Sequence, residues 1–263
     1  MPTTDRQVFH LALAELMRRQ SAPPIAQPED LTAFELGVYS QNGEDGMLAE
    51  IFRRLGPGRR EFVEFGVGRG VEGNCVALAD VLGWSGLFME GDETASRSLA
   101  WKYRDNSRVR TAQAMVTAEN VEELLAANGV SDEPDVVSID VDGNDLWIWK
   151  AMTRTRPRVV VIEYNAHLDH TRSLVIPYDP DWVWDGTDWF GASLAALEIV
   201  GRERGYRLVH TELAGANAFF VRDDYADRFD DVRSVPRRSQ NYDGHGYGLP
   251  EHPGGGRYVE LAG

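Results

Sequence analysis

The chain has 263 residues, of which 43% are hydrophobic and 10% aromatic, and it carries a formal net charge of −15. This apolar content is enough to bury a core and excludes a wholly disordered chain, while the negative charge disfavours nucleic acid and anionic membrane surfaces as partners. A small-molecule partner fits better. Because no apolar run is long enough to span a bilayer and the N-terminus lacks the pattern of a signal peptide, we expect a cytoplasmic protein.

The first predicted element is an amphipathic helix. Apolar residues recur at helical spacing between residues 5 and 19, and a linker rich in Pro and Ala follows. Such a helix can join copies of the chain into a homodimer or a higher homo-oligomer, cover a pocket, or pack on its own domain, which is the simplest interpretation. We assign residues 1–25 to this helix and linker. A second helix is predicted between Ser40 and Gly56.

Short β-rich runs then alternate with helical or polar stretches, which is typical of a parallel sheet covered by helices. Five such runs lie at residues 61–65, 86–90, 109–114, 136–140 and 159–163. A helix over residues 192–204 precedes two runs, 206–210 and 218–222, that predict an antiparallel hairpin. These patterns indicate one α/β domain over residues 26–225, with helices on both faces of a seven-stranded, mostly parallel sheet. Residues 226–263, rich in Gly and Pro, form a predicted C-terminal tail.

A glycine-rich turn follows the first predicted strand. Gly66, Gly68 and Gly70 stand at alternate positions after Glu64, and Asn74, a good helix N-cap, lies just beyond them. Glycine allows a tight turn and lets a ligand approach backbone amides. The turn therefore suits a nucleoside-bearing cofactor, although a glycine turn without a ligand is the alternative.

A carboxylate ends the next predicted strand, in the sequence Glu90-Gly91-Asp92. In a nucleotide-binding sheet this is where the ribose diol lies, and a carboxylate can accept both hydroxyl protons. Glu90 is therefore the candidate ribose ligand.

Several segments together resemble S-adenosylmethionine-dependent methyltransferases of class I, and among them the FkbM-like family. Glu64 stands two places before the first glycine, the glycine spacing differs from the dinucleotide pattern, and a hairpin follows the fifth parallel strand. The matching segments are residues 40–45, 63–66, 138–143 and 161–163, in order within residues 39–222. The chain reads Asp142-Gly143-Asn144-Asp145 where many members have Glu-Gly, so the resemblance does not identify the substrate.

The resemblance implies a Rossmann-like methyltransferase fold that binds S-adenosylmethionine at the glycine turn. It implies that Glu64 faces the cationic methionine end of the cofactor, that residues 41–45 bound the pocket, and that residues 114–117 flank the adenine. The predicted cofactor-binding residues are Gln41, Asp45, Glu64, Gly66, Gly68, Gly70, Asn74, Glu90, Gly91, Asp92, Val116 and Asp140.

Oxygen-bearing side chains follow the fourth and fifth predicted strands. Asp140 with Asp142, and Glu163 with Asn165, are two residues apart, a spacing that places side chains on one face of a strand. In a methyltransferase-like sheet these strands are adjacent, so the four can hold a hard cation such as Mg²⁺. The set is similar in type to the acid, acid and Asn of metal-dependent O-methyltransferases. Alternatively, Asp142 or Asn144 caps the next helix while Asp140 and Glu163 position substrate by hydrogen bonds.

His167 lies two residues beyond Asn165, on a long loop that continues to Gly191. Histidine is the side chain best suited to remove a proton near neutral pH, so His167 and Asp140 are the candidate catalytic residues. A solvated or structural histidine is the alternative. The loop is rich in aromatic residues and is predicted to shape the acceptor pocket, unless its Trp residues cap the edge of the core.

These features predict an S-adenosylmethionine-dependent enzyme that methylates a hydroxyl of a small molecule, such as a natural product or a sugar-like metabolite, with or without a divalent metal. Methylation of an amine is the less favoured alternative. One alternative is an NAD(P)-dependent oxidoreductase, which the glycine turn and Glu90 favour but the glycine spacing and the hairpin oppose. Another is a non-catalytic Rossmann-like binding protein. The acid-rich strand ends oppose it, because burying carboxylates that serve no purpose costs stability.

Overall fold

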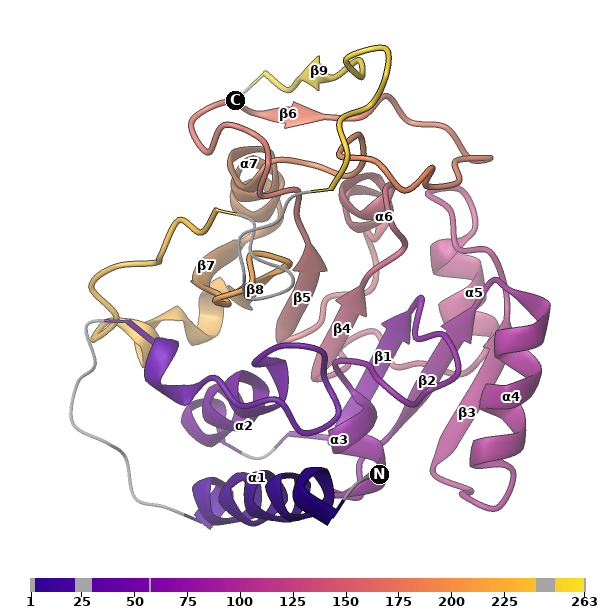
Figure 1. Ribbon diagram of the computed structural model, residues 1–263, viewed down its shortest axis with the longest axis vertical. Helices are drawn as coiled ribbons and strands as arrows, with labels where there is room; N and C mark the ends of the chain where they lie inside the picture. The colour runs from indigo at the N-terminus through magenta and orange to yellow at the C-terminus, as the bar shows by residue number, and fades with distance from the viewer. Residues whose placement is uncertain (1–2, 22–29, 57, 240–248, 263) are drawn as a thin grey trace.

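The computed structural model describes residues 3–21, 30–56, 58–239 and 249–262, and a seven-stranded sheet forms its centre (Figure 1). The strands of this sheet are β1 (Glu61–Phe65), β2 (Ser85–Glu90), β3 (Val109–Gln113), β4 (Val136–Ile139), β5 (Val159–Glu163), β7 (Tyr206–Thr211) and β8 (Asn217–Arg222). The helices are α1 (Thr3–Ser21), α2 (Glu44–Leu55), α3 (Val76–Asp80), α4 (Glu93–Tyr103), α5 (Val121–Ala127), α6 (Asp145–Ala151) and α7 (Leu194–Arg204), with 3-10 turns η1 (Thr32–Phe34) and η2 (Asp223–Phe229).

The strands follow the order β3-β2-β1-β4-β5-β8-β7. β1 to β5 are parallel, whereas β8 is antiparallel to both β5 and β7. The order reverses between β1 and β4, and in open α/β sheets such a point opens a crevice at the carboxyl edge. The predicted seven-stranded methyltransferase-like sheet with its C-terminal hairpin is confirmed, and the strand ends lie within about two residues of those predicted.

Separate hydrophobic cores cover the two faces of the sheet, because successive side chains of a strand point to opposite faces. On one face Val63 and Phe65 pack with α5, α6 and α7 around the fully buried Trp149. On the other face Phe62 and Phe88 pack with α2, α3 and α4. The central strands are therefore buried on both faces, which explains why they read as continuous apolar runs.

Helix α1 lies against α2, as Figure 1 shows. Leu16 of α1 is fully buried and packs with Ala49 and Ala77, so the prediction that this helix packs on its own domain is confirmed. The predicted linker after it lies mostly in residues 22–29, outside the described residues. None of the described helices is both long enough and apolar enough to cross a membrane.

The C-terminal segment returns to the domain, unlike the extended tail that the sequence predicted. β9 (Val259–Glu260) pairs antiparallel with β6 (Leu174–Val175), above the carboxyl ends of β4 and β5 (Figure 1). The N–H of Asp188 also donates to the carbonyl of Pro250 at 3.0 Å. Each of these strands has only two residues, so no local periodicity marks them, and Val175 of β6 also forms a bridge with Ala192.

Candidate functional site

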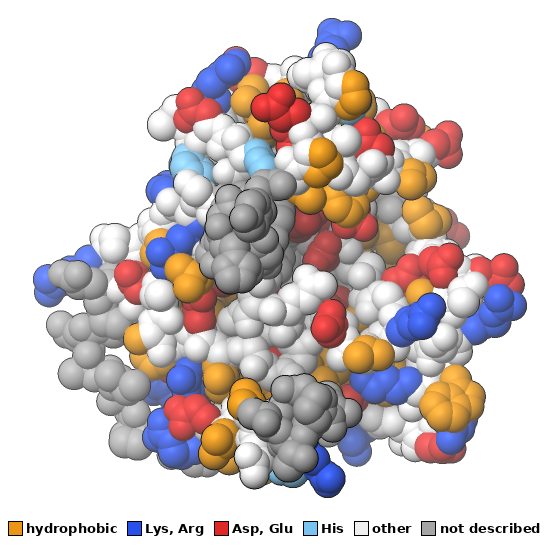
Figure 2. All heavy atoms as spheres, viewed as in Figure 1, with side chains coloured by type: hydrophobic (Ala, Val, Ile, Leu, Met, Phe, Trp, Pro, Cys, Tyr) orange, Lys and Arg blue, Asp and Glu red, His pale blue; other side chains and the backbone are white. Residues whose placement is uncertain are grey.

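Three adjoining cavities lie at the carboxyl edge of the sheet, where the strand order reverses. The central cavity has a volume of about 500 Å³, the glycine-turn cavity about 330 Å³ and the side cavity about 150 Å³. Gly66 and Asp140 line all three. Figure 2 shows acidic side chains in a hollow on this face. The central cavity is lined by Gln41, Asn42, Gly66, Asp140, Asp142, Glu163, Trp184, Phe190, Ala216, Asn217 and Leu249.

The three glycines of the turn after β1 have different roles. All have positive φ angles, between 60° and 75°, which favour glycine. A Cβ at Gly66 would lie 1.7 Å from the carbonyl oxygen of Asp140, so Gly66 lets two backbone segments approach each other. A Cβ at Gly68 would meet no atom within 4 Å, whereas one at Gly70 would collide with Leu99 of α4. Of the three, Gly68 is therefore the one that leaves open space for a ligand.

Glu64 holds the backbone just before α3, and no side chain caps this helix among the described residues. The carboxylate of Glu64 accepts the backbone N–H groups of Asn74 at 2.7 Å and of Cys75 at 2.9 Å, just before α3 begins. The side chain of Asn74 instead donates to Ser138 Oγ at 3.0 Å, so the N-cap prediction for Asn74 is wrong. Burial raises the pKa of Glu64 to about 7, against the effect of the two N–H donors. Glu64 and Asn74 both line the glycine-turn cavity.

Glu90 holds the glycine turn against the end of β2. Its carboxylate accepts the N–H of Gly68 at 2.7 Å and the N–H of Asp92 at 2.8 Å. Asp92 caps α4 by accepting the N–H of Ala95 at 2.7 Å. Glu90 and Gly91 line the side cavity together with Val116. Asp92 is not among the residues that line the three cavities in the described structure.

The segment before α2 is shaped by Asp45. This buried carboxylate accepts the N–H groups of Val38, Tyr39 and Ser40 at 2.6–2.9 Å, and burial raises its pKa. Gln41, in the loop so formed, lines both the central and the glycine-turn cavity. Of the two residues predicted from this segment, the structure places Gln41 at the site, while Asp45 supports the loop from within.

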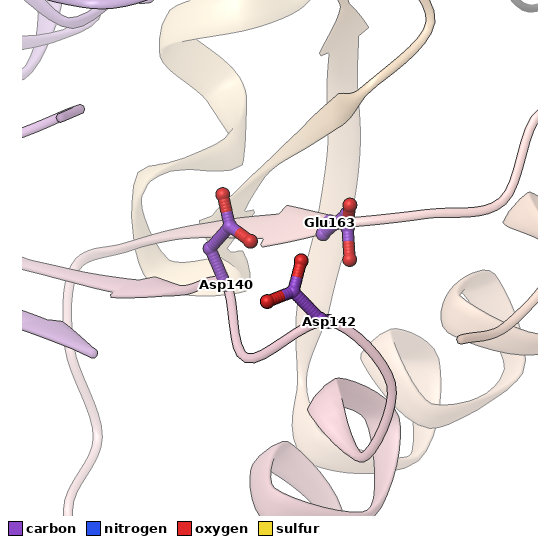
Figure 3. Close-up of side chains that lie close together, drawn as sticks. All are labelled: Asp140, Asp142 and Glu163. Carbon is purple, nitrogen blue, oxygen red and sulfur yellow. The ribbon is translucent and has the colours of Figure 1, made fainter. Parts of the chain in front are cut away.

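Asp140, Asp142 and Glu163 form a group of carboxylates at the ends of β4 and β5, and Figure 3 shows them facing one another. Oxygens from the three lie within 4.8 Å of one another. Strand alternation does not bring Asp140 and Asp142 together, because β4 ends at Ile139 and Asp142 has a φ of 57°. Asp145 stabilises this turn instead: its carboxylate accepts the N–H groups of Val141 and Gly143, both at 2.8 Å.

Within the described parts of the chain, no cationic side chain balances the charges in this group. Burial and then the neighbouring Asp145 raise the pKa of Asp140 well above its usual range, while burial and then Asp140 do the same for Glu163. Burial and then Glu90 raise the pKa of Asp142. Among the described residues no Lys, Arg or His forms an ion pair with these three acids. A positively charged ligand would therefore stabilise the group.

Asn165 does not join the carboxylates, contrary to the prediction. Its NH₂ group donates to the carbonyls of Asp188 at 2.8 Å and Phe190 at 3.0 Å, and its oxygen accepts the N–H of His167 at 3.0 Å. Asn165 therefore fastens the ends of its own loop. The strand pattern is lost beyond Glu163, the last residue of β5, so the expected same-face placement does not hold.

Asn217 is the amide residue that sequence reasoning missed. It begins β8 and pairs in register with Glu163, and it lines both the central and the glycine-turn cavity. Its NH₂ group donates to Glu44 at 2.9 Å and its backbone N–H donates to Glu212 at 2.6 Å. The sequence indicated only a strand near this position, because the pairing of β8 with β5 depends on residues far apart in the chain.

Aromatic residues of the loop after β5 form the outer wall. Trp184 and Phe190 line the central cavity, and Trp182 lines the side cavity. The indole N–H of Trp182 donates to the carbonyl of Asp142 at 3.0 Å, which holds this part of the loop to the carboxylate turn. The role predicted for the loop in shaping a pocket therefore agrees with where these residues lie.

His167 lies at the start of this loop. Its side chain is exposed, and partial burial lowers its pKa, an effect that the nearby Asp188 carboxylate opposes. His167 is not among the described residues that line the three cavities, whereas Asp140 lines all of them. Of the two candidate catalytic residues, the structure brings only Asp140 to the centre of the site.

No protein-family model matches the chain, and no curated protein matches it in sequence. Among solved structures it is similar to a fibrillarin pre-rRNA processing protein of Methanococcus jannaschii, at 14% identity and a TM-score of 0.44 over 67% of this chain and 74% of that one. It is also similar to the N-terminal domain of EvdMO1 with SAH bound, at 18% identity and a TM-score of 0.42 over 82% and 94% of the two chains. A third similar structure is an S-adenosylmethionine-dependent methyltransferase of Clostridium acetobutylicum, at 9% identity and a TM-score of 0.43 over 68% and 90%. Such identities do not transfer a function, and the fold stands on the strand order of this chain itself.

Proposed function

We propose that this protein is an S-adenosylmethionine-dependent methyltransferase that methylates a hydroxyl group of a small-molecule acceptor. The observation that carries the proposal is the row of three cavities along the switch point of the sheet. They run from the open space at Gly68, past Asp140, to the carboxylates and aromatic residues of the central cavity. A cofactor that occupies the glycine-turn cavity and the side cavity would present its reactive group toward the central cavity.

The glycine-turn cavity suits the methionine end of the cofactor, which carries a sulfonium and an ammonium group. Glu44, Glu64 and Asp140 line this cavity, and the basic side chain among its lining residues, Arg69, is exposed. Acidic walls attract a cationic group. The open space beside Gly68 leaves room for it.

The side cavity suits the adenosine end. Its apolar wall includes Ala114, Met115, Val116, Pro180 and Trp182. Such a wall favours a flat aromatic ring. Glu90 lies beside it and already accepts two backbone N–H groups. A carboxylate offers about four acceptor positions, so Glu90 can still accept the hydroxyls of a ribose.

In the proposed reaction, the acceptor oxygen attacks the methyl carbon. The new C–O bond forms as the S–C bond breaks, and the cofactor leaves as a neutral thioether. The hydroxyl proton passes to the carboxylate of Asp140. Without a bound cation, burial raises the pKa of Asp140, which makes its ionised form a better base, whereas a cation held by Asp140 would lower this pKa. Catalysis then consists mainly of alignment and proton removal.

The proposal also includes a divalent cation such as Mg²⁺, bound by the three neighbouring carboxylates. Asp140, Asp142 and Glu163 offer the oxygen ligands that hard cations prefer. The Oε2 atom of Glu163 is buried and accepts no hydrogen bond from any described residue, which fits a group meant for a cation. When bound, such an ion lowers the pKa of a coordinated hydroxyl group.

His167 is the alternative proton acceptor. Its lowered pKa keeps the imidazole neutral near pH 7, and a neutral imidazole can take a proton. It would have to reach the acceptor from the loop that follows β5, outside the described lining of the cavities.

Calorimetric titration of the full chain with S-adenosylhomocysteine, and separately with NAD, tests the cofactor. We expect binding of the first and none of the second. NAD binding alone would select the oxidoreductase, and failure of both ligands to bind would favour a non-catalytic binding protein.

Mass spectrometry tests the reaction. The protein is incubated with labelled S-adenosylmethionine and a mixture of hydroxylated metabolites, and one product should gain the mass of the labelled methyl group. Chelation with EDTA should slow this reaction and Mg²⁺ should restore it. Full activity in chelator would contradict the cation and leave the methyltransferase intact.

A further inference from the structure

Asn217 lies beside the three carboxylates, on strand β8, which pairs with the strand that carries Glu163. The antiparallel register pairs Glu163 of β5 with Asn217 of β8. In such a pair the two side chains point to the same face, with their Cβ atoms roughly 5 Å apart. Asn217 also lines the central cavity together with Asp140, Asp142 and Glu163.

Hydrogen bonds fix the orientation of the Asn217 amide. Glu44 is held by the N–H and the NH₂ group of Asn42, at 3.0 and 3.2 Å, and it accepts the NH₂ group of Asn217 at 2.9 Å. Because an ionised carboxylate only accepts, the NH₂ side of Asn217 must face Glu44. The oxygen of Asn217 then points away from Glu44.

This amide oxygen has no partner among the described residues. Asn217 is only 4% exposed, and its Oδ1 atom is buried and accepts no hydrogen bond. An unpaired buried acceptor is unfavourable, so this oxygen is available to a ligand. Asn165 differs, because its oxygen is already used within its loop.

We propose that the amide oxygen of Asn217 completes a divalent-cation site with the carboxylates of Asp140, Asp142 and Glu163. The inference rests on the cation in the proposed function and names a ligand that neither strand pattern nor spacing indicates. Asn217 provides a neutral oxygen, a ligand type that hard cations accept alongside carboxylates. Glu44 is a positioning residue, because it turns the amide so that oxygen rather than nitrogen faces the ion.

Asn144 provides a matched control for this inference. It is also buried, its Oδ1 atom also has no partner among the described residues, and its NH₂ group donates to the carbonyl of Asp179. It lines the side cavity, which includes Asp140 and Asp142 but not Glu163. Removing it therefore deletes the same chemical group on the other side of the carboxylates.

The test is a titration of the full chain with Mn²⁺ in the absence of cofactor. Electron paramagnetic resonance measures the concentration of the free ion. We expect wild type to bind Mn²⁺ and Asn217→Ala to bind it at least about tenfold more weakly, the loss that an outer-shell partner alone causes at other metal sites. Asn144→Ala should stay within about threefold of wild type. Asn217→Asp keeps an oxygen and should retain at least half of the wild-type affinity. Thermal unfolding of each variant without metal shows whether it folds.

Three results would overturn the proposal. They are no Mn²⁺ binding by wild type, unchanged affinity in Asn217→Ala, or a loss in Asn217→Asp as large as in the alanine variant. The last would mean that Asn217 acts through its bond to Glu44 rather than through its oxygen. If Asn217→Ala does not fold, the aspartate variant decides. Titration with S-adenosylhomocysteine is independent of all these outcomes, so failure of the cation site and failure of the methyltransferase proposal remain distinguishable.

Discussion

Acidic side chains lie on both sides of the candidate site, but they have different surroundings. Beside the glycine turn, Glu64 and Glu90 each accept two backbone N–H groups. At the ends of β4 and β5, Asp140, Asp142 and Glu163 face one another, and Oε2 of Glu163 accepts no hydrogen bond from any described residue. The first set stabilises loops, whereas the second is left with uncompensated charge.

This difference separates structural from ligand-binding roles. A carboxylate that accepts N–H groups holds backbone in place, so its loss should change the shape of the site. A carboxylate without donors contributes little to folding and costs free energy when ionised, so its purpose lies with a ligand. The predictions below test this division, from the largest expected effect to the smallest.

Two glycines of the turn, Gly66 and Gly68, should lose ligand binding for different reasons. Gly66→Ala should abolish binding of S-adenosylhomocysteine and lower the melting temperature, because its Cβ would lie 1.7 Å from the carbonyl of Asp140. Gly68→Ala should still fold, although a side chain strains its φ of 60°, and it should bind the ligand at least about tenfold more weakly, since its methyl group projects into open space. Calorimetry and thermal unfolding measure both variants. Equal affinity of wild type and Gly68→Ala would move the cofactor elsewhere.

Replacing the proposed base should reduce the rate of chemistry. Asp140→Asn should slow single-turnover methylation by about two to four orders of magnitude, because an amide cannot take the acceptor proton. The control is Asp181→Asn, an exposed acid on the neighbouring loop, which should leave the rate unchanged.

The same measurement on His167→Ala separates the two candidate bases. If His167 takes the proton, its variant should show the loss of two to four orders of magnitude, while its affinity for S-adenosylhomocysteine stays that of wild type. When the methylation rate is measured as a function of pH, the slower variant should lose the change in rate that reflects ionisation of the base. A wild-type profile for Asp140→Asn would exclude Asp140 from proton transfer.

The aromatic wall should affect the acceptor and not the cofactor. Trp184→Ala should raise the KM for the acceptor roughly tenfold and leave affinity for S-adenosylhomocysteine unchanged, because Trp184 lines the central cavity only. Val183→Ala is the matched control, since Val183 is adjacent, 78% exposed and absent from the lining residues. A change in cofactor affinity instead would place the acceptor pocket elsewhere.

Glu212 should give the smallest effect, a change in how stability depends on pH. Burial raises its pKa from 4.5 to about 7 although it accepts the N–H groups of Gly215, Ala216 and Asn217. Between these pH values the folded chain holds a proton that the unfolded chain has released, so stability from this group falls as pH rises from about 4.5 to 7. Glu212→Gln cannot titrate.

The melting temperature of Glu212→Gln relative to wild type should therefore rise by at least about 3 °C between pH 4.5 and pH 8. Scanning calorimetry at both pH values measures this difference, in which the titration of all other groups cancels. If the two proteins differ in melting temperature by the same amount at both pH values, Glu212 titrates normally despite its burial.

Local pattern in the sequence was enough to predict the element order, the glycine turn and the hairpin. The apolar runs that become β1 to β5 are continuous because both faces of these strands are covered, and Gly66 and Gly68 mark the turn because other residues rarely adopt their φ angles. Adjacency of β4 and β5 also followed from the predicted sheet, so the meeting of Asp140 with Glu163 was foreseeable.

Tertiary structure alone decided which polar atoms are left for a ligand. Glu64 holds the backbone before α3 while the side chain of Asn74 bonds Ser138, Asn165 is used by its own loop, and Asn217 lies beside Glu163. Each outcome depends on hydrogen bonds or strand register between residues that are distant in the chain. Spacing records which side chains share a strand or a turn, but a donor or acceptor is free only after all its neighbours in the folded chain are counted.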